Sequence, residues 1–315
     1  MIKENVYKVL QLFLSNNYFF KIKLHIIKNK KKLTIINLHR INPDKKIHNS
    51  ITPSIFNKLI QYLKNEFNII CFNDLKNYKI EDNKPPLIIS FDDAYEDFFN
   101  YAAEIIINNN IKVNQNIIPY GLLTEKPPIN VQFQDLFNSG ILNETSQIKL
   151  CKLLNIKSLN LYSLTNSIKN LSIENQKKLL NKFSSEIESL NSKQKTKIMN
   201  LRQVNDTKTI CELGIHSYEH ATMTNESIDY FKNDLKKSIN FFESNFSNKP
   251  VIYAFPNGKY NNQHISYLKY KKFKYILLVG NNINKFNSTG IFYRNQVLGS
   301  SLKKNQFTSL GGLKF

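Results

Sequence analysis

The sequence contains no tryptophan and, among 315 residues, only three cysteines, nine glycines and nine prolines. The cysteines, Cys71, Cys151 and Cys211, are far apart and form no Cys-x-x-Cys motif. An odd number of scattered cysteines argues against a disulfide framework and against a cysteine-based zinc site. So few glycines and prolines exclude a collagen-like chain and argue against an array of linkers. No run of about 20 apolar residues is present, so we expect no transmembrane segment.

Acidic residues are scarce as well, because 44 Lys and Arg against 24 Asp and Glu give a net charge of +20. The excess is mostly lysine spread along an Asn- and Ile-rich chain, which indicates compositional drift. The one dense basic run, Lys28 to Lys32, fits a solvated surface, and contact with an anionic membrane or polyanion stays an open alternative. Phe and Tyr are plentiful but form no RNP-like pattern, so we predict no nucleic-acid partner.

The N-terminal segment is weakly apolar. Val6 to Leu14 is interrupted by Lys8 and Gln11 and has no small-residue cleavage site after it. The pattern therefore predicts an amphipathic helix and not a secretory signal. We expect a cytoplasmic protein, with peripheral contact to the inner membrane face through this segment left open.

Strand and helix patterns alternate along the chain, which is typical of an α/β fold with mostly parallel strands. A helix is predicted to start at Thr52-Pro53, and others at residues 95–108, 225–246 and 263–271. The expected strands are 33–38, 68–72, 87–91, 112–118, 212–215, 251–255, 275–279 and 291–294. About seven strands favour a barrel or partial barrel, and an open doubly wound sheet is the alternative.

Residues 129–208 have a different pattern, rich in Leu, Lys, Asn and Ser with apolar residues at helical spacing. We interpret them as a helical insertion within one domain. It is either a lid or substrate wall or a purely structural excursion, and the lack of a catalytic-looking cluster favours the latter. The expected organisation is a basic amphipathic segment (1–32), a main domain (33–300) and a C-terminal tail (301–315).

Reactive residue types follow four of the apolar strands. They are His39-Arg40, Asp92-Asp93, His216-Ser-Tyr-Glu-His220 and Pro256-Asn-Gly258. The C-terminal ends of parallel strands converge on one face of an α/β fold, where active sites lie. Four such coincidences indicate one shared site.

Each cluster alone has a simpler explanation, because paired aspartates, histidines four apart and Pro-Asn-Gly all occur in ordinary turns and surfaces. Together they fit a metal hydrolase. Two neutral imidazoles and one carboxylate leave room for water and substrate, as catalytic zinc requires. A second carboxylate that does not reach the metal is free to act as a base, and the Asp92-Asp93 pair supplies both roles.

Four ordered motifs resemble the polysaccharide deacetylase family, the NodB-homology carbohydrate esterases of family four. They are Asn-Leu-His39-Arg-Ile, Ser90-Phe-Asp-Asp-Ala94, His216-Ser-Tyr-Glu-His220 and Ala254-Phe-Pro-Asn-Gly258. The resemblance covers roughly residues 33–298. It implies a deformed (β/α) barrel of about seven strands with a helical insertion, in agreement with the strand count.

The resemblance also implies roles. Asp93, His216 and His220 match the family's metal ligands, usually to zinc, and Asp92 matches its general base. The metal polarises the acetamide carbonyl and lowers the pKa of a water. The backbone N–H of Asn257 matches the donor to the oxyanion.

Two further roles depend on departures from the commonest family pattern. The late Leu-x-His motif is missing, but one branch of the family takes its acid histidine from the first strand, so His39 is our candidate acid. The arginine that usually orients the base is also missing, and Arg294 is the candidate replacement. We assign Pro256, Gly258 and Tyr218, from the same motifs, to substrate binding.

Smaller departures concern single positions. His264 lies in a predicted helix and matches the family's acid poorly. Ile252 or Tyr253 stands where the family's arginine is expected. Ala94 replaces the usual glycine, a mild change provided that the backbone there is not left-handed.

The resemblance thus implies a metal-dependent hydrolase that removes N-acetyl groups from amino sugars of a surface polysaccharide or its precursor. Its partner is an N-acetylated glycan, and its cofactor is a divalent metal, most commonly zinc. Two alternatives remain open. One is a glycan-binding protein with this fold but impaired catalysis, and the other is a different amide or ester hydrolase on the same metal site.

Overall fold

The computed structural model describes residues 17–44, 47, 50–79, 84–280, 282–286 and 290–312. The helix predicted for residues 6–14 lies outside this part of the chain, so it stays a prediction. The first described element is α2 (Asn17–Asn29), which ends within the basic run. No helix among the described residues has the length and apolarity needed to cross a membrane.

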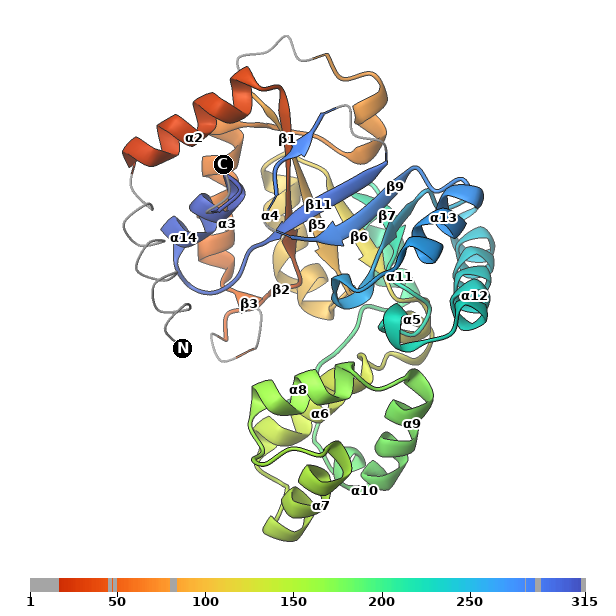
Figure 1. Cartoon of the computed structure of the whole chain (residues 1–315). Helices are drawn as coiled ribbons and strands as arrows, with labels where there is room; N and C mark the ends of the chain where they lie inside the picture. The colour runs from red at the N-terminus through yellow and green to blue at the C-terminus, as the bar shows by residue number, and fades with distance from the viewer. Residues whose placement is uncertain are drawn as a thin grey trace.

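Seven parallel strands form a closed barrel (Figure 1). They are β1 (Lys32–Leu38), β5 (Pro86–Asp92), β6 (Val113–Ile117), β7 (Cys211–Ile215), β8 (Ile252–Ala254), β9 (Tyr275–Val279) and β11 (Ile291–Gln296). β1 closes the ring because it pairs with β5 on one side and with β11 on the other. The predicted seven-strand barrel is confirmed, and the ring closure excludes the open doubly wound sheet.

Short strands extend or flank the barrel. β4 (Asn68–Ile69) pairs with β5, β10 (Asn284–Lys285) pairs antiparallel with β1, and β2 (Arg40–Ile41) pairs with β3 (Ser50–Ile51). The predicted strand 68–72 is wrong in its second half, because η1 (Phe72–Lys76) begins there. The Asp74 carboxylate accepts a hydrogen bond from the Cys71 N–H at 2.7 Å and so favours the turn over an extended chain.

Helices cover the outside of the barrel. α3 (Pro53–Glu66) starts as predicted, because Thr52 accepts a hydrogen bond from the Ile55 N–H and Pro53 occupies the first turn. Its apolar stripe, Phe56, Leu59, Ile60 and Leu63, is fully buried. The other covering elements are η2 (Phe98–Ala102), α4 (Ala103–Asn108), α11 (Leu201–Thr207), α12 (Ile228–Phe246), α13 (Asn262–Tyr270) and α14 (Leu302–Ser309).

Residues 129–190 form a separate group of helices below the barrel in Figure 1, reached through α5 (Pro119–Thr124). They are α6 (Ile129–Ser139), α7 (Glu144–Leu154), α8 (Leu161–Lys169), α9 (Ile173–Lys182) and α10 (Ser184–Glu188). Their buried side chains, including Phe133, Leu164 and Phe183, make an apolar cluster distinct from the core of the barrel. The insertion therefore holds its own shape and is fixed to the barrel at the C-terminal ends of the strands.

Candidate metal centre and active-site pocket

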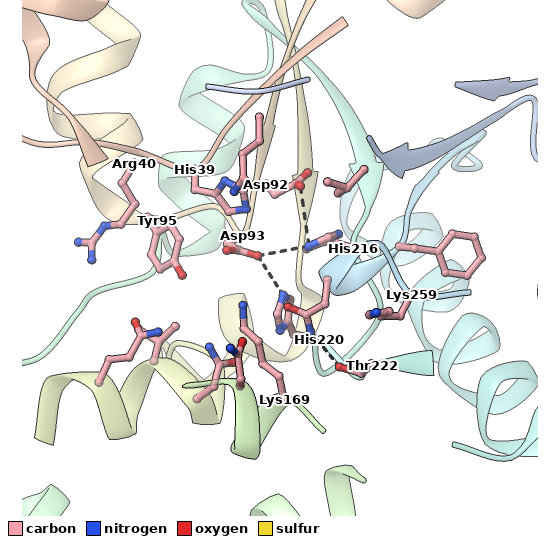
Figure 2. A pocket seen from close by; sticks show the side chains of 18 of the residues that line it. His39, Arg40, Asp92, Asp93, Tyr95, Lys169, His216, His220, Thr222 and Lys259 are labelled. Carbon is pink, nitrogen blue, oxygen red and sulfur yellow. Dashed lines mark hydrogen bonds and ion pairs between the residues drawn. The ribbon is translucent and has the colours of Figure 1, made fainter. Parts of the chain in front are cut away.

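The C-terminal ends of the barrel strands line a pocket of about 440 Å³ (Figure 2). Asp92 ends β5 and Asp93 follows it, while His216 follows β7. His39 follows β1, and Asn257 lies in the turn η4 (Pro256–Gly258) after β8. The residues that the four sequence clusters predicted to meet are thus gathered in one place.

Three side chains are arranged as ligands to a single cation. Asp93 Oδ1 lies 3.4 Å from His216 Nε2 and 3.5 Å from His220 Nε2. All three residues are buried, and their ligand atoms lie within 4.8 Å of one another. Tetrahedral bonds of about 2.1 Å to zinc place two ligand atoms about 3.4 Å apart. The observed separations therefore fit a zinc-sized ion.

The surroundings of these ligands also suit a cation. His216 Nδ1 lies 2.9 Å from the Ala254 carbonyl oxygen, which holds the ring in the tautomer with a free lone pair on Nε2. Burial lowers the pKa of His220 to about 3 against the opposing charge of Asp93, so its imidazole is neutral at pH 7. Asp93 Oδ1 is buried without a hydrogen-bond partner. An orphaned carboxylate oxygen facing the Nε2 atoms of two imidazoles is the donor set that a divalent metal stabilises.

The loop that carries both histidines is held from beneath by Asp234 of α12. The Asp234 carboxylate accepts hydrogen bonds from the Tyr218 N–H at 2.9 Å and from the Ser217 hydroxyl at 3.0 Å. Ser217 and His220 both have left-handed backbone conformations, with φ of 63° and 60°. Strained residues persist where surrounding contacts fix them, and here those contacts aim the two imidazoles at one point.

Asp93 and Ala94 are left-handed too, with φ of 75° and 55°. The condition under which alanine is a harmless replacement for the family's glycine is therefore not met. Ala94 is also fully buried. A left-handed L-residue costs about 1–2 kcal/mol, so this chain accepts strain directly beside a metal-ligand position.

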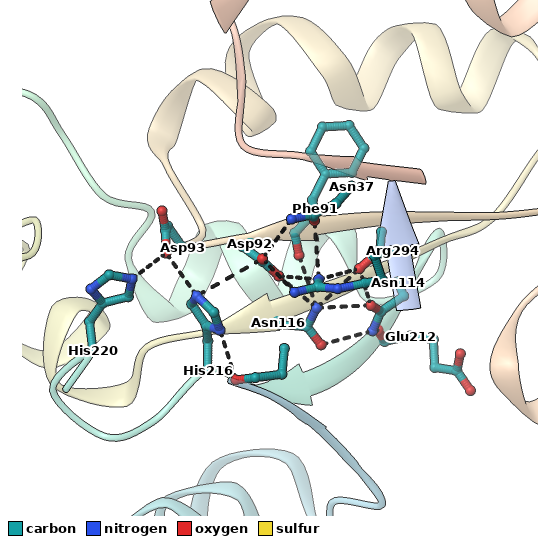
Figure 3. A network of polar contacts seen from close by, with 12 residues as sticks. Asn37, Phe91, Asp92, Asp93, Asn114, Asn116, Glu212, His216, His220 and Arg294 are labelled. Atoms are coloured by element: carbon teal, nitrogen blue, oxygen red, sulfur yellow. Dashed lines mark hydrogen bonds and ion pairs between the residues drawn. The ribbon is translucent and has the colours of Figure 1, made fainter. Parts of the chain in front are cut away.

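Asp92 has a different environment from its neighbour (Figure 3). The Arg294 guanidinium donates to Asp92 Oδ1 at 2.7 Å and to Oδ2 at 2.9 Å. Asn116 donates to Oδ1 at 2.8 Å, and Asn37 donates to Oδ2 at 3.0 Å. Each carboxylate oxygen thus accepts two hydrogen bonds inside the barrel. Asp92 is anchored by the protein, whereas Asp93 is open to an ion.

These contacts decide the charge of Asp92. Burial alone would raise its pKa, but the charge of Arg294 and the hydrogen bond from Arg294 outweigh burial and hold the pKa far below its usual value. Arg294 is itself completely buried and also donates to Ser90 Oγ at 2.9 Å. Asp92 is therefore ionised at neutral pH, which is the state that a general base requires.

Two other predicted residues face the pocket. His39 lines it with a buried Nδ1 that has no hydrogen-bond partner, and burial lowers the pKa of the ring. Asn257 has a left-handed φ of 55°, and its side chain donates to Thr222 Oγ1 at 2.9 Å. His264, the poor family match, instead accepts the Asn261 N–H at 3.2 Å at the start of α13 and packs on the ring of Phe231.

The residues assigned to substrate binding lie behind or beside the pocket. Pro256 and Gly258 frame the turn that presents Asn257 and do not line the cavity. Gly258 has φ of +63°, and a Cβ there would meet Val279 Cβ at 2.8 Å. Tyr218 lines a separate depression together with Lys177. The structure thus does not bring Tyr218 into the metal pocket.

The sequence did not reveal the wall opposite the barrel. Asn130, Gln134, Asn166 and Lys169 reach the pocket from α6 and α8, so the insertion forms part of the site and is not a purely structural excursion. Tyr95 was missed as well. Burial, the charge of Asp93 and a hydrogen bond to it raise the pKa of the Tyr95 hydroxyl, which places that group against the candidate ligand. Neither Tyr95 nor the four wall residues stand in a recognisable motif, so only the folded chain shows that they line the pocket.

Comparison with known proteins agrees with this geometry. A family model described as polysaccharide deacetylase matches residues 191–276, which include both histidines and the Pro-Asn-Gly turn. No curated protein matches the sequence. Among solved structures, the deacetylase PplD of Streptococcus pyogenes superposes with a TM-score of 0.58 at 15% identity, over 89% of this chain and 98% of that one.

Two further structures share the fold. IcaB from Ammonifex degensii matches with a TM-score of 0.57 at 12% identity, over 89% of this chain and 97% of its own. A de-N-acetylase from Aggregatibacter actinomycetemcomitans matches with a TM-score of 0.53 at 15% identity, over 86% and 95%. The fold likeness extends over most of the chain, and the family model covers the part that carries two of the candidate ligands. The resemblance inferred from four short motifs is confirmed by the family model over residues 191–276, and the solved structures show that the chain shares their fold.

Proposed function

We propose that this protein is a metal-dependent hydrolase that removes N-acetyl groups from amino sugars of a surface polysaccharide or its precursor. The observation that carries the proposal is the pairing of two adjacent aspartates with opposite environments. Asp93 faces two imidazoles with an unpartnered oxygen, and Asp92 is held by four hydrogen bonds at its side. One supplies a ligand, and the other supplies a base.

Asp93, His216 and His220 would hold the metal. When bound, a divalent cation at such a site polarises a carbonyl and lowers the pKa of a water. We propose zinc, because two neutral imidazoles and one carboxylate with open positions is its usual catalytic set, although cobalt suits the same ligands.

The chain's own residues divide the remaining work. Asp92 accepts a proton from the attacking water, whose oxygen bonds to the acetamide carbon. Arg294 and the two asparagines fix the direction of that carboxylate. The Asn257 backbone N–H donates to the developing oxyanion. When the C–N bond breaks, the leaving amine takes a proton from His39, His39 regains one from the protonated Asp92, and acetate and a free amino sugar result.

The relatives support this chemistry. PplD was solved in complex with acetate, which is the small product of N-deacetylation. The Aggregatibacter protein is described as a de-N-acetylase. These statements concern those proteins, and they support the same reaction here because the pocket offers the residues that it needs.

The alternative of an inactive glycan-binding protein rested partly on the missing family arginine. Arg294 contacts Asp92 with both terminal guanidinium nitrogens, so the base has an orienting partner from another strand. That observation favours an active enzyme.

Acetate release from N-acetylglucosamine oligomers tests the proposal. The purified protein should lose activity with a chelator, regain it with zinc, and lose at least about 100-fold in kcat in Asp92→Asn. Activity on small acylated amines but not on the oligomers would instead support a different amide hydrolase. Glycan binding without any acetate release would support the binding protein.

A further inference from the structure

The substrate side of the pocket carries a lysine that forms no ion pair with any carboxylate among the described residues. Lys169, at the last position of α8, points from the insertion toward Asp93 and His220 in Figure 2. Among the described residues, no ion pair or side-chain hydrogen bond is made by its ammonium group. Burial lowers the pKa of Lys169, and the charge of Asp93 opposes that shift. A partly buried ammonium group without a partner is costly unless a bound molecule supplies one.

The position of Lys169 is fixed by its backbone. Its carbonyl oxygen accepts a hydrogen bond from the Asn225 side chain at 2.9 Å, which ties the end of α8 to the barrel. Glu226 beside it accepts the Ile173 N–H at 2.6 Å, at the start of α9. The barrel therefore holds this wall in place, and the ammonium group belongs to the site and not to a free surface.

The other charges in the pocket do not neutralise Lys169. Asp92 is paired with Arg294, and Asp93 belongs to the metal-ligand set. Arg40 is paired with Asp97 at 2.7 Å. Lys259, on the opposite rim, is exposed and adds a second positive charge.

The neutral groups around Lys169 suit a sugar. Asn130, Gln134, Asn166 and Asn170 line the same wall from α6 and the end of α8. Gln134 uses its amide nitrogen on Thr165 at 3.0 Å, which leaves its carbonyl oxygen to accept. Amide side chains both donate and accept, so they complement hydroxyl groups beside a charged substituent.

We propose that Lys169 binds an oxyanion substituent, a carboxylate or a phosphate, on the glycan whose acetamide is presented to Asp93, His216 and His220. The substrate class is then an anionic N-acetylated glycan and not a neutral one. This inference rests on the proposed function, because it places the acetamide at the metal ligands. It adds that the insertion selects the substrate.

Calorimetric binding to the zinc-loaded full chain tests the proposal, with acetate release followed in the same samples. The ligands are a neutral N-acetylglucosamine oligomer, an oligomer alternating with a uronic acid, and an oligomer carrying a phosphate monoester. Wild type should bind at least one anionic oligomer about tenfold or more tightly than the neutral one, as a hydrogen bond to a charged group implies. The arm that shows the preference identifies the oxyanion.

The variants assign that preference to one residue. Lys169→Met should abolish it while changing neutral-oligomer binding by less than about twofold, and Lys169→Arg should keep most of it. Lys157→Met, an exposed lysine of the same insertion, is the matched control and should leave all three affinities unchanged. Raising the salt concentration should weaken the binding of the two anionic oligomers and leave that of the neutral oligomer unchanged.

Equal binding of neutral and anionic oligomers by wild type would overturn the inference, as would an equal loss on every ligand in Lys169→Met. Failure of the proposed function has a different signature. If acetate is never released while Lys169-dependent binding persists, the deacetylase is wrong and the anion site stands. If neutral oligomers are deacetylated as well as anionic ones, the deacetylase stands and the anion site is wrong.

Discussion

Arg294 and Asp92 are 202 residues apart in the chain, yet two parallel hydrogen bonds of 2.7 and 2.9 Å join the guanidinium to both carboxylate oxygens. The two charges are fully buried inside the barrel. The pair both neutralises the interior and fixes the direction of the carboxylate beside the candidate metal ligands. Positioning of the proposed base and stability of the barrel therefore depend on one contact.

Arg294→Lys should separate those two effects, since a lysine keeps the charge but loses the planar fork. We expect kcat to fall by about 10- to 100-fold with KM within about threefold, because the base is misdirected while the pocket wall is intact. Arg294→Met leaves Asp92 unpaired and should lower the unfolding free energy by about 3–5 kcal/mol.

Steady-state kinetics and urea unfolding measure these effects. Arg202→Lys on α11 is the matched control, because the Arg202 side chain is 90% exposed and should change neither quantity. A normal kcat in Arg294→Lys would show that the orientation of Asp92 does not depend on the two parallel hydrogen bonds from the guanidinium.

Tyr95→Phe should weaken zinc binding by about 10-fold or more, because hydrogen bonds to metal ligands commonly contribute that much to affinity. The Tyr95 hydroxyl interacts with the Asp93 carboxylate, and the ring lies 4.7 Å from the Arg40 guanidinium. A competition titration with a chromogenic chelator measures the affinity. Tyr162→Phe, at an 80% exposed position of α8, should bind zinc as wild type does. An unchanged affinity in Tyr95→Phe would mean that the hydroxyl does not support the ligand.

Ala94→Gly should leave stability unchanged or raise it by up to about 1 kcal/mol. Glycine relieves the strain of the left-handed backbone at φ 55°, and the greater entropy of the unfolded glycine chain offsets part of that gain. Ala103→Gly is the opposite control, since Ala103 has helical φ and ψ of −58° and −46° and should lose about 1 kcal/mol. Urea unfolding of both variants gives the comparison. A clear loss of stability in Ala94→Gly would contradict the strain at this position.

Glu212 should make stability depend on pH. Burial raises the pKa of Glu212 from its usual 4.5 to about 7, although the N–H groups of Phe72 and Asn73 donate to its carboxylate and oppose the shift. Between these values the folded protein holds a proton that the unfolded chain has released. The unfolding free energy of wild type relative to Glu212→Gln should therefore fall, by at most about 3 kcal/mol, as the pH rises from 4.5 to 8.

Urea unfolding of both proteins at several pH values gives this difference. Glu188→Gln, at an exposed position of α10, should show no such trend. A difference that rises with pH would mean that the backbone hydrogen bonds outweigh burial at Glu212.

The sequence was enough to locate the barrel and the candidate ligands. The strands ending at Asp92 and preceding His216 are local apolar runs, and parallel strands place such ends on one face. The rest needed the folded chain. The helical spacing of apolar residues around Lys169 predicts only which side chains pack in the core of the insertion. It does not indicate that α8 lines the pocket that holds the candidate metal ligands.

The left-handed backbone conformation at Ala94 could not be predicted from the sequence either. The left-handed φ of Ala94 is imposed by the surrounding contacts and not by its own preference, since alanine disfavours that region. The Arg294 pair is a similar case, because a buried arginine on a late strand has no local signature of its partner. Arg294 was proposed from the resemblance, and only the closed barrel shows why it reaches Asp92.

The most direct test of the account is the zinc stoichiometry of the metal-stripped protein, titrated by calorimetry beside Asp93→Asn and His216→Asn. We predict one ion per wild-type chain, with affinity reduced by at least about 100-fold in each variant while the barrel stays folded by circular dichroism. No zinc binding by wild type, or wild-type affinity for zinc in both variants, would show that these side chains do not share an ion.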